Sequence, residues 1–171
     1  MPLIDSAFWL TSGAIIGLLI LSAFFSGSET ALTASSRATM LRLAQDGNRN
    51  AGVVNRLLSA RERLIGALLL GNNVVNILSA ALATALMTRL FGESGVAVAT
   101  LVMTALVLIF AEVLPKTYAI TNAEKAAVRV APVIKVIIPI FSPVVTLVRA
   151  LVRGILYLFG VRTDPDSKFL A

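Results

Sequence analysis

Cysteine and histidine are both absent from this chain of 171 residues. Thiolate chemistry, disulfides and imidazole metal sites are therefore excluded, which leaves oxygen as the ligand type for any metal ion. Charged residues are scarce at 14%, whereas hydrophobic residues make up 57% and the mean hydropathy is +0.89. Soluble domains carry more charge and fewer apolar residues. The composition therefore indicates an integral membrane protein, and the fold class that we expect is all-α.

Three apolar segments are long enough to cross a bilayer as helices, which takes roughly 20 residues. They cover residues 8–35, 64–88 and 95–121. The connection between the first two carries six arginines against two acidic residues. Because basic residues stay on the cytoplasmic side, we expect a multi-pass protein of the cytoplasmic membrane with its N-terminus outside and its C-terminus in the cytoplasm. The net charge of +6 then reflects topology and does not indicate a nucleic-acid partner.

The regions outside these segments predict how the chain is organised. Residues 37–60 have helical spacing of leucine and valine around DGNRN, which predicts two short helices on the inner surface. Asp5 precedes a long apolar run, unlike a cleaved signal peptide, so we expect the first helix to remain in the mature protein. We expect residues 1–160 to form a transmembrane ion-transport domain. Residues 161–171 are expected to be a linker to further domains of a longer protein.

Within the expected juxtamembrane region 124–160, residues 132–160 allow two interpretations. They are apolar, but the later part carries Arg149 and Arg153 one turn apart, and the early part is interrupted by Pro132, Pro139 and Pro143. Two arginines on one face fit a helix that lies in the membrane interface, with its guanidinium groups at the lipid headgroups. We therefore predict juxtamembrane helices on the cytoplasmic side, with a fourth crossing as the alternative.

One polar residue in each apolar segment lies at the same depth. Ser26 lies nine residues before Ser35, Asn72 nine after Arg63, and Glu112 nine before Thr121, all counted from the inner ends. At about 1.5 Å rise per residue, each of them lies roughly 13 Å from the inner boundary. The three side chains can therefore form a single layer.

Helical spacing adds further members to this layer. Ser22 and Ser26 are four residues apart, as are Asn72 and Asn76, so each pair shares a helix face, whereas Asn73 points elsewhere. Glu29 lies close to the serine stripe. The simpler interpretation is that serine and asparagine only form hydrogen bonds between helices, which is common in membranes.

Glu112 is the strongest candidate, because an ionisable group inside hydrocarbon usually marks an ion path. Pro115 cannot donate a backbone hydrogen bond, so the carbonyl of Ala111 should lose its partner and become a further oxygen ligand. Hydroxyl, amide, carboxylate and carbonyl oxygens together suit a hard cation such as Mg2+. The alternatives are a structural ion pair between Glu112 and Lys116 and a simple packing kink at Pro115.

Small residues indicate close helix contacts. Gly71 allows a neighbouring backbone to approach Asn72, and Gly13 and Gly17 form the GxxxG pattern found at contacts between membrane helices. Three crossings shield a cation path poorly. We therefore expect a homodimer as the working unit.

The segments FFSGSETAL, LLLGNNVVNIL and FAEVLPKTYA occur in this order, with the basic segment between the first two. In these motifs the chain resembles the transmembrane domain of the CorB/CorC and cyclin-M (CNNM) magnesium transporter family, and most of all its bacterial and archaeal CorB branch. The resemblance runs from about residue 8 to 160. FSGSE alone would be a weak signal, but the ordered set is specific.

The resemblance implies three crossings with a juxtamembrane helical belt, a homodimer, and a Mg2+ site that opens toward the cytoplasm. Family members usually carry cytoplasmic CBS domains after this region. Ser28 and Glu29 fit the bacterial form of the motif and, with Lys116, are second choices as site residues. The family's motif positions fall on Ser22, Ser26, Asn72, Asn76 and Glu112, with the backbone near Pro115.

These observations predict Mg2+ transport, in the direction of efflux, through an inward-facing cavity. The alternative is a Mg2+-binding sensor or scaffold in the membrane that moves no ion. Na+ is a candidate coupling ion. An intramembrane enzyme is not expected, because a single well-placed carboxylate without cysteine or histidine provides no pair of nucleophile and base.

Overall fold

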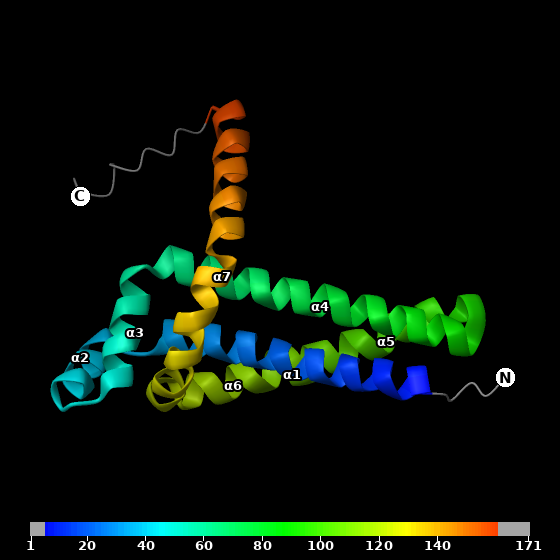
Figure 1. Ribbon diagram of the computed structural model, residues 1–171, viewed down its shortest axis with the longest axis horizontal. Helices are drawn as coiled ribbons and strands as arrows, with labels where there is room; N and C mark the ends of the chain where they lie inside the picture. The colour runs from blue at the N-terminus through cyan, green and yellow to red at the C-terminus, as the bar shows by residue number, and fades with distance from the viewer. Residues whose placement is uncertain (1–5, 161–171) are drawn as a thin grey trace.

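The computed structural model describes residues 6–160, and every regular element among them is helical. Asp5 and the expected linker at 161–171 lie outside the described residues. Three long helical stretches lie side by side in Figure 1. They are α1 (Ser6–Ala34), α4 (Arg61–Phe91), and a third stretch made of α5 (Gly95–Leu106), η2 (Val107–Val113) and α6 (Leu114–Thr121). The three predicted segments are thereby confirmed, with ends that agree within three residues.

A tight turn reverses the chain between α4 and α5. The turn η1 (Gly92–Ser94) begins at Gly92, whose φ of +64° is a conformation that glycine adopts without a steric penalty. A Cβ atom at Gly95 would overlap the carbonyl oxygen of Met87. The two glycines therefore allow α4 and α5 to pack as a close hairpin.

The basic connection forms α2 (Arg37–Gln45) and α3 (Arg49–Ser59), so the two predicted short helices are confirmed. Gly47, with a φ of +93°, lies in the turn between them. The side chain of Asn48 then accepts hydrogen bonds from backbone N–H groups in the first turn of α3 and caps it. Figure 1 shows α2 and α3 at one end of the bundle, which we call the basic end; η1 lies at the opposite end, the η1 end.

A single continuous helix, α7 (Ala123–Leu158), follows the bundle, contrary to the prediction that prolines interrupt this region. A proline removes one backbone hydrogen bond and bends a helix, but it need not end the helix where packing holds both sides. The side chains of Ala127, Ala131 and Ile134 are fully buried on both sides of Pro132. The axis of α7 accordingly changes direction without a break (Figure 1).

The orientation of α7 differs from that of the other long helices, because it runs across the bundle rather than along it (Figure 1). It packs against α1, α3 and α4, and beyond Val145 it exposes many large apolar side chains. A helix in this orientation lies along the membrane surface when the bundle crosses the bilayer. The helix is long and apolar enough to cross a membrane, but this arrangement favours the juxtamembrane interpretation.

Arg149 does not follow the expectation that both arginines reach lipid headgroups. Its guanidinium lies 3.7 Å from the carboxylate of Glu62 at the start of α4. Arg153, one turn further along, is exposed. A partly exposed pair contributes little free energy, so its effect is mainly to orient α7 against α4.

Two hydrophobic clusters hold the bundle together. The larger one lies at the basic end and joins α1, α4 and α7 through fully buried side chains that include Leu32, Leu68 and Ile134. The smaller one joins α1, α4 and α5 toward the η1 end through residues such as Ile15 and Met103. The level of the predicted polar layer lies between the two clusters.

The glycines predicted to form helix contacts behave differently from one another. A Cβ atom at Gly71 would lie 2.7 Å from the ring of Phe25 on α1, so α1 does approach closely, but with a side chain and not with the backbone that was predicted. At Gly13 and Gly17 a Cβ atom would meet nothing within 4 Å. Among residues 6–160, the GxxxG pattern therefore makes no close contact with another helix.

We predict that Gly71→Ala lowers the free energy of unfolding by about 1–3 kcal/mol, because the added methyl group overpacks the contact with buried Phe25. The matched change Gly154→Ala adds a methyl group where no atom lies within 4 Å. It should leave stability unchanged or raise it slightly, since alanine favours helix. Thermal unfolding of the detergent-solubilised variants measures both effects, and equal midpoints would contradict the packing described for Gly71.

Candidate cation site

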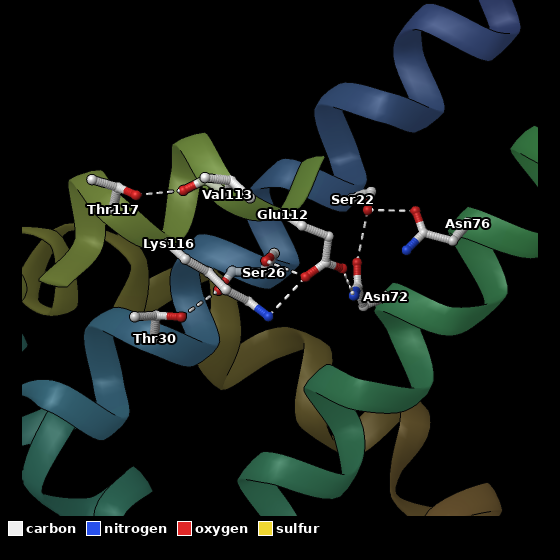
Figure 2. Close-up of polar contacts among 9 residues, drawn as sticks. All are labelled: Ser22, Ser26, Thr30, Asn72, Asn76, Glu112, Val113, Lys116 and Thr117. Atoms are coloured by element: carbon white, nitrogen blue, oxygen red, sulfur yellow. Dashed lines mark hydrogen bonds and ion pairs between the residues drawn. The ribbon is translucent and has the colours of Figure 1, made fainter. Parts of the chain in front are cut away.

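Polar side chains from three helical stretches meet between the two hydrophobic clusters (Figure 2). Glu112, in η2, lies at their centre. The Nδ2 atom of Asn72 on α4 donates a hydrogen bond of 3.0 Å to Glu112 Oε1. The Oγ atom of Ser26 on α1 lies 3.5 Å from Glu112 Oε2, which is longer than an ordinary O–H···O bond. The three residues predicted to share one layer are thus brought together.

Ser22 links this centre to a second asparagine. Its Oγ atom lies 2.7 Å from Oδ1 of Asn72 and 2.6 Å from Oδ1 of Asn76. A hydroxyl group has one proton to donate, so one of these two oxygen–oxygen contacts has no proton between its atoms. Asn72 cannot turn its amide without losing the hydrogen bond to Glu112. Asn76 is free of that restraint, and a turn of its amide lets its NH2 group donate to Ser22 Oγ while Ser22 donates to Asn72 Oδ1.

We call Ser22, Ser26, Asn72, Asn76 and Glu112 the polar cluster. Both serines are fully buried and Asn72 is 8% exposed, whereas the side chain of Glu112 is 26% exposed. Asn73, as the helical spacing predicted, is exposed and lies outside the polar cluster. The carboxylate is thus more accessible to an arriving ion than the two serines and Asn72.

Lys116 occupies the open side of this carboxylate. Its Nζ atom lies 2.7 Å from Glu112 Oε2, one helical turn away (Figure 2). The ion pair considered as an alternative interpretation is therefore present. It does not remove Glu112 from the polar cluster, because Asn72 binds the other carboxylate oxygen.

The π-helix η2 sets the direction of Glu112. At its end, the backbone N–H of Leu114 donates to the carbonyl of Ile109, five residues back instead of the four of an α-helix. Pro115 follows directly, and its ring would clash with the carbonyl four residues back in a regular α-helix. The wider turn accommodates the proline and rotates the preceding side chains, and such π-turns occur frequently at functional sites.

The π register changes which backbone carbonyl loses its hydrogen bond at Pro115. The expectation of a free carbonyl at Ala111 assumes an α-helix through Pro115. In the π register, the N–H that Pro115 lacks would have bonded to the carbonyl of Phe110 instead. Ala111 is fully buried, and its carbonyl stays a predicted ligand.

Ser28 and Glu29, the second choices, do not join the polar cluster. Ser28 is 1% exposed, its Oγ atom has no hydrogen-bond partner among residues 6–160, and it lines a separate small cavity beside Arg129. Glu29 is partly buried, one turn nearer the basic end, and close enough to interact electrostatically with Lys116 and Glu112. Both residues therefore lie beside the site and not in it.

A groove of about 510 Å³ runs along α4 and α5 from the polar cluster toward the η1 end. Asn76 and Glu112 line the part of it that lies at the polar cluster. The sequence predicted a cavity that opens toward the cytoplasmic end, which is the basic end. The observed groove runs in the opposite direction. On the basic side, Lys116 is paired with the carboxylate.

Three threonines along this groove are functional candidates that the sequence did not reveal. Thr84, Thr100 and Thr104 line its part nearer the η1 end. The available signal was the spacing of Thr84, eight residues after Asn76 and thus on the same helix face. A threonine hydroxyl that donates to its own helix, as Thr100 does to Val96 at 2.8 Å, still presents lone pairs to the groove.

The donor set defines what this site can bind. Among residues 6–160, no three histidine, cysteine, aspartate or glutamate side chains gather as they do in tight metal sites. The polar cluster instead combines one carboxylate with neutral oxygens. Hard cations take such ligands, and their affinity falls with the number of charged ligands. This chemistry fits a hard cation that is bound and released again.

Residues 13–170 match the family model described as the cyclin M transmembrane N-terminal domain. The chain belongs to this family. The resemblance noted in the sequence motifs is thereby confirmed, and the matched residues include the whole polar cluster. The family membership and the three apolar helical stretches together make this a multi-pass membrane protein in contact with the lipid bilayer.

Relatives occur in bacteria and plants. The UPF0053 inner membrane protein YfjD of Escherichia coli strain K12 is 43% identical over 144 residues, which cover 84% of this chain and 34% of YfjD. A UPF0053 protein of Haemophilus influenzae is 42% identical over 113 residues, which cover 66% of this chain and 27% of that protein. A chloroplastic DUF21 domain-containing protein of Arabidopsis thaliana is 42% identical over 123 residues, which cover 71% of this chain and 19% of that protein. The chain spans about a third or less of the length of these relatives.

We predict that Pro115→Ala moves Glu112 away from Asn72. Alanine restores a backbone N–H and removes the ring, so the segment can return to the α-helical register, in which each residue turns by about 100°. Because the chain has no cysteine, the pair Asn72→Cys and Glu112→Cys can be joined by a short thiol cross-linker. The cross-linking yield should fall sharply when Pro115→Ala is added.

The pair Asn73→Cys and Glu112→Cys is the matched control and should cross-link poorly in either background. An unchanged yield for the Asn72 pair after Pro115→Ala would show that the proline does not maintain the wide turn.

Proposed function

We propose that this protein moves Mg2+ across the cytoplasmic membrane and that the polar cluster is the site through which the ion passes. The observation that supports this most directly is the contact of Asn72 and Ser26 with Glu112, because it joins three membrane-crossing stretches at one carboxylate. Any relative movement of these helices changes the contact. A site at such a junction can therefore open first to one side of the membrane and then to the other.

Mg2+ matches these ligands best among the common cations. It prefers oxygen ligands, keeps several of its waters, and is usually bound through one or two carboxylates. Soft metals favour thiolate ligands, which this chain lacks. One negative charge limits the affinity, and limited affinity lets the ion leave. We propose the side-chain oxygens of the polar cluster, together with the Ala111 carbonyl, as the ligands.

Family membership supports the same function. The membrane proteins of the cyclin M family are linked to the transport of Mg2+ and other divalent cations, which is consistent with a role other than catalysis. Because the chain spans only part of its relatives, the activity of the whole protein is part of this proposal. CBS domains in the cytoplasm are the partners that we propose for it.

We propose efflux as the direction, with the N-terminus outside and with α2, α3 and the start of α7 at the cytoplasmic face, since their arginines and lysines belong on that side. A homodimer is the proposed working unit. An apolar groove of about 730 Å³ on η2 and α6, lined by residues such as Ile109, Val113 and Tyr118, offers a surface to the second copy.

We predict that Glu112→Gln abolishes Mg2+ flux across sealed proteoliposomes, because glutamine keeps the size of the side chain but removes the charge that offsets dehydration of the ion. A fluorescent Mg2+ indicator measures the flux. Undiminished flux in a folded Glu112→Gln protein would refute the role of the polar cluster.

The same assay separates the alternatives. Mg2+ binding by the unaltered protein without any flux would identify a sensor or scaffold instead of a transporter. Acceleration of Mg2+ efflux by an opposing Na+ gradient would identify Na+ as the coupling ion.

Asn72 and Asn73 provide a matched pair for a binding test. We predict that Asn72→Leu weakens Mg2+ affinity by at least about tenfold, because it removes a ligand oxygen and the N–H group that orients Glu112. Asn73→Leu makes the same chemical change on the exposed face of α4 and should leave the Kd unchanged. Isothermal titration with MgCl2 measures both, and equal losses would contradict the assignment of Asn72.

A further inference from the structure

Lys116 carries a positive charge where an arriving cation would meet Glu112. Its Nζ atom is 2.7 Å from Oε2, the oxygen that Ser26 also approaches at 3.5 Å. The other oxygen, Oε1, accepts the hydrogen bond from Asn72. Figure 2 shows these groups arranged around one carboxylate. A dehydrated ion therefore cannot bind Oε2 while the ammonium group stays in place.

The ion pair between Lys116 and Glu112 is suited to exchange. The side chain of Lys116 is 42% exposed, and partly exposed ion pairs are weak. The lysine ammonium is a compact charge on a flexible stem. Lys116 can therefore leave the carboxylate by side-chain rotation, with no movement of the helix backbone. A divalent ion with twice the charge competes directly for the same oxygen.

Glu29 is a second carboxylate within the electrostatic reach of Lys116. It lies on α1, nearer the basic end than the polar cluster, and interacts electrostatically with both Lys116 and Glu112. Among residues 6–160, no lysine or arginine nitrogen lies within 4.0 Å of the Glu29 carboxylate. Glu29 follows Ser26 by about one turn of α1, and Ser26 lies 3.5 Å from the same Oε2 atom that Lys116 pairs with. Lys116 is thus paired with Glu112, while Glu29 lies one turn from that contact.

We infer that Lys116 is a tethered cation, which pairs with Glu112 while the polar cluster is empty and moves to Glu29 when Mg2+ binds. This inference rests on the proposed function. The exchange leaves neither Glu112 nor Lys116 unpaired inside the membrane, where a lone charge is costly. The return of Lys116 to Glu112 then favours release of the ion. Lys116 is a positioning residue and not a ligand.

Competition of this kind means that removing the ammonium tightens Mg2+ binding. Lys116→Met keeps the length of the side chain and should lower the Kd for Mg2+ by about fivefold, the upper effect of a partly exposed ion pair. Lys116→Arg keeps the charge and should not lower the Kd. Lys125→Met removes an exposed charge near the start of α7 and should leave the Kd unchanged. Titration of the purified full chain with MgCl2 measures each value.

Glu29→Gln tests the transfer step. If Glu29 receives Lys116, this change raises the Kd in the unaltered background and has no effect when combined with Lys116→Met, because no ammonium is left to be received. If Glu29 binds Mg2+ itself, Glu29→Gln should raise the Kd in both backgrounds. That result would overturn the transfer.

Glu112→Gln distinguishes a failure of this inference from a failure of the proposed function. Mg2+ binding that survives Glu112→Gln unchanged refutes the polar cluster as the site. Suppose that Glu112→Gln loses Mg2+ binding but Lys116→Met leaves the Kd unchanged. That combination overturns only the tethered cation, and the polar cluster remains the proposed site. Lys116→Gln serves for the same comparison should Lys116→Met not elute from size exclusion like the unaltered protein.

Discussion

A carboxylate inside an apolar helix bundle has to be paired, and the pairing of Glu112 links the helices around it. A charge in hydrocarbon costs about 3 kcal/mol by the lowest scales and more by the others. Its partners here, Asn72, Ser26 and Lys116, come from α4, α1 and α6. The interactions that make the charge tolerable therefore also join the three crossings. A cation that binds this carboxylate competes with these partners for its oxygens, which couples ion binding to the helix arrangement.

The direction of Glu112 depends on an irregular backbone. Pro115 lacks the N–H that an α-helix needs, and the chain responds with a π-turn that rotates the residues before it. On the opposite helix, a Cβ atom at Gly27 would lie only 3.3 Å from the Cβ of Pro115. The absence of a side chain at Gly27 thus lets the proline pack closely against α1. The site requires the proline and the glycine together.

The packing of the bundle is uneven along its length. The larger hydrophobic cluster lies at the basic end, where α7 is packed across α1, α3 and α4. The smaller cluster lies toward the η1 end, where the groove along α4 and α5 reaches the polar cluster. Regions with fewer buried apolar contacts open at lower free energy. Separation of the helices near the site is therefore expected to begin on the η1 side, while the basic end holds together.

The sequence alone was sufficient to predict the membrane class, the three crossings, the two short helices and the members of the polar cluster. These are one-dimensional properties, because apolar length, turn residues and helical spacing are read along a single segment. The resemblance to the cyclin M family rests on the same local motifs. Ser22, Ser26, Asn72, Asn76 and Glu112 could therefore be chosen before any contact between them was known.

The tertiary structure decided how these parts meet. Packing on both sides of Pro132 keeps α7 continuous, and the fit of Pro115 against α1 accompanies the π register that alters the argument for Ala111. The position of Lys116 over Glu112, and of Glu29 beside them, depends on how segments far apart in the chain are rotated about their axes. Spacing within one helix cannot specify that rotation, because it is set by the neighbouring helices.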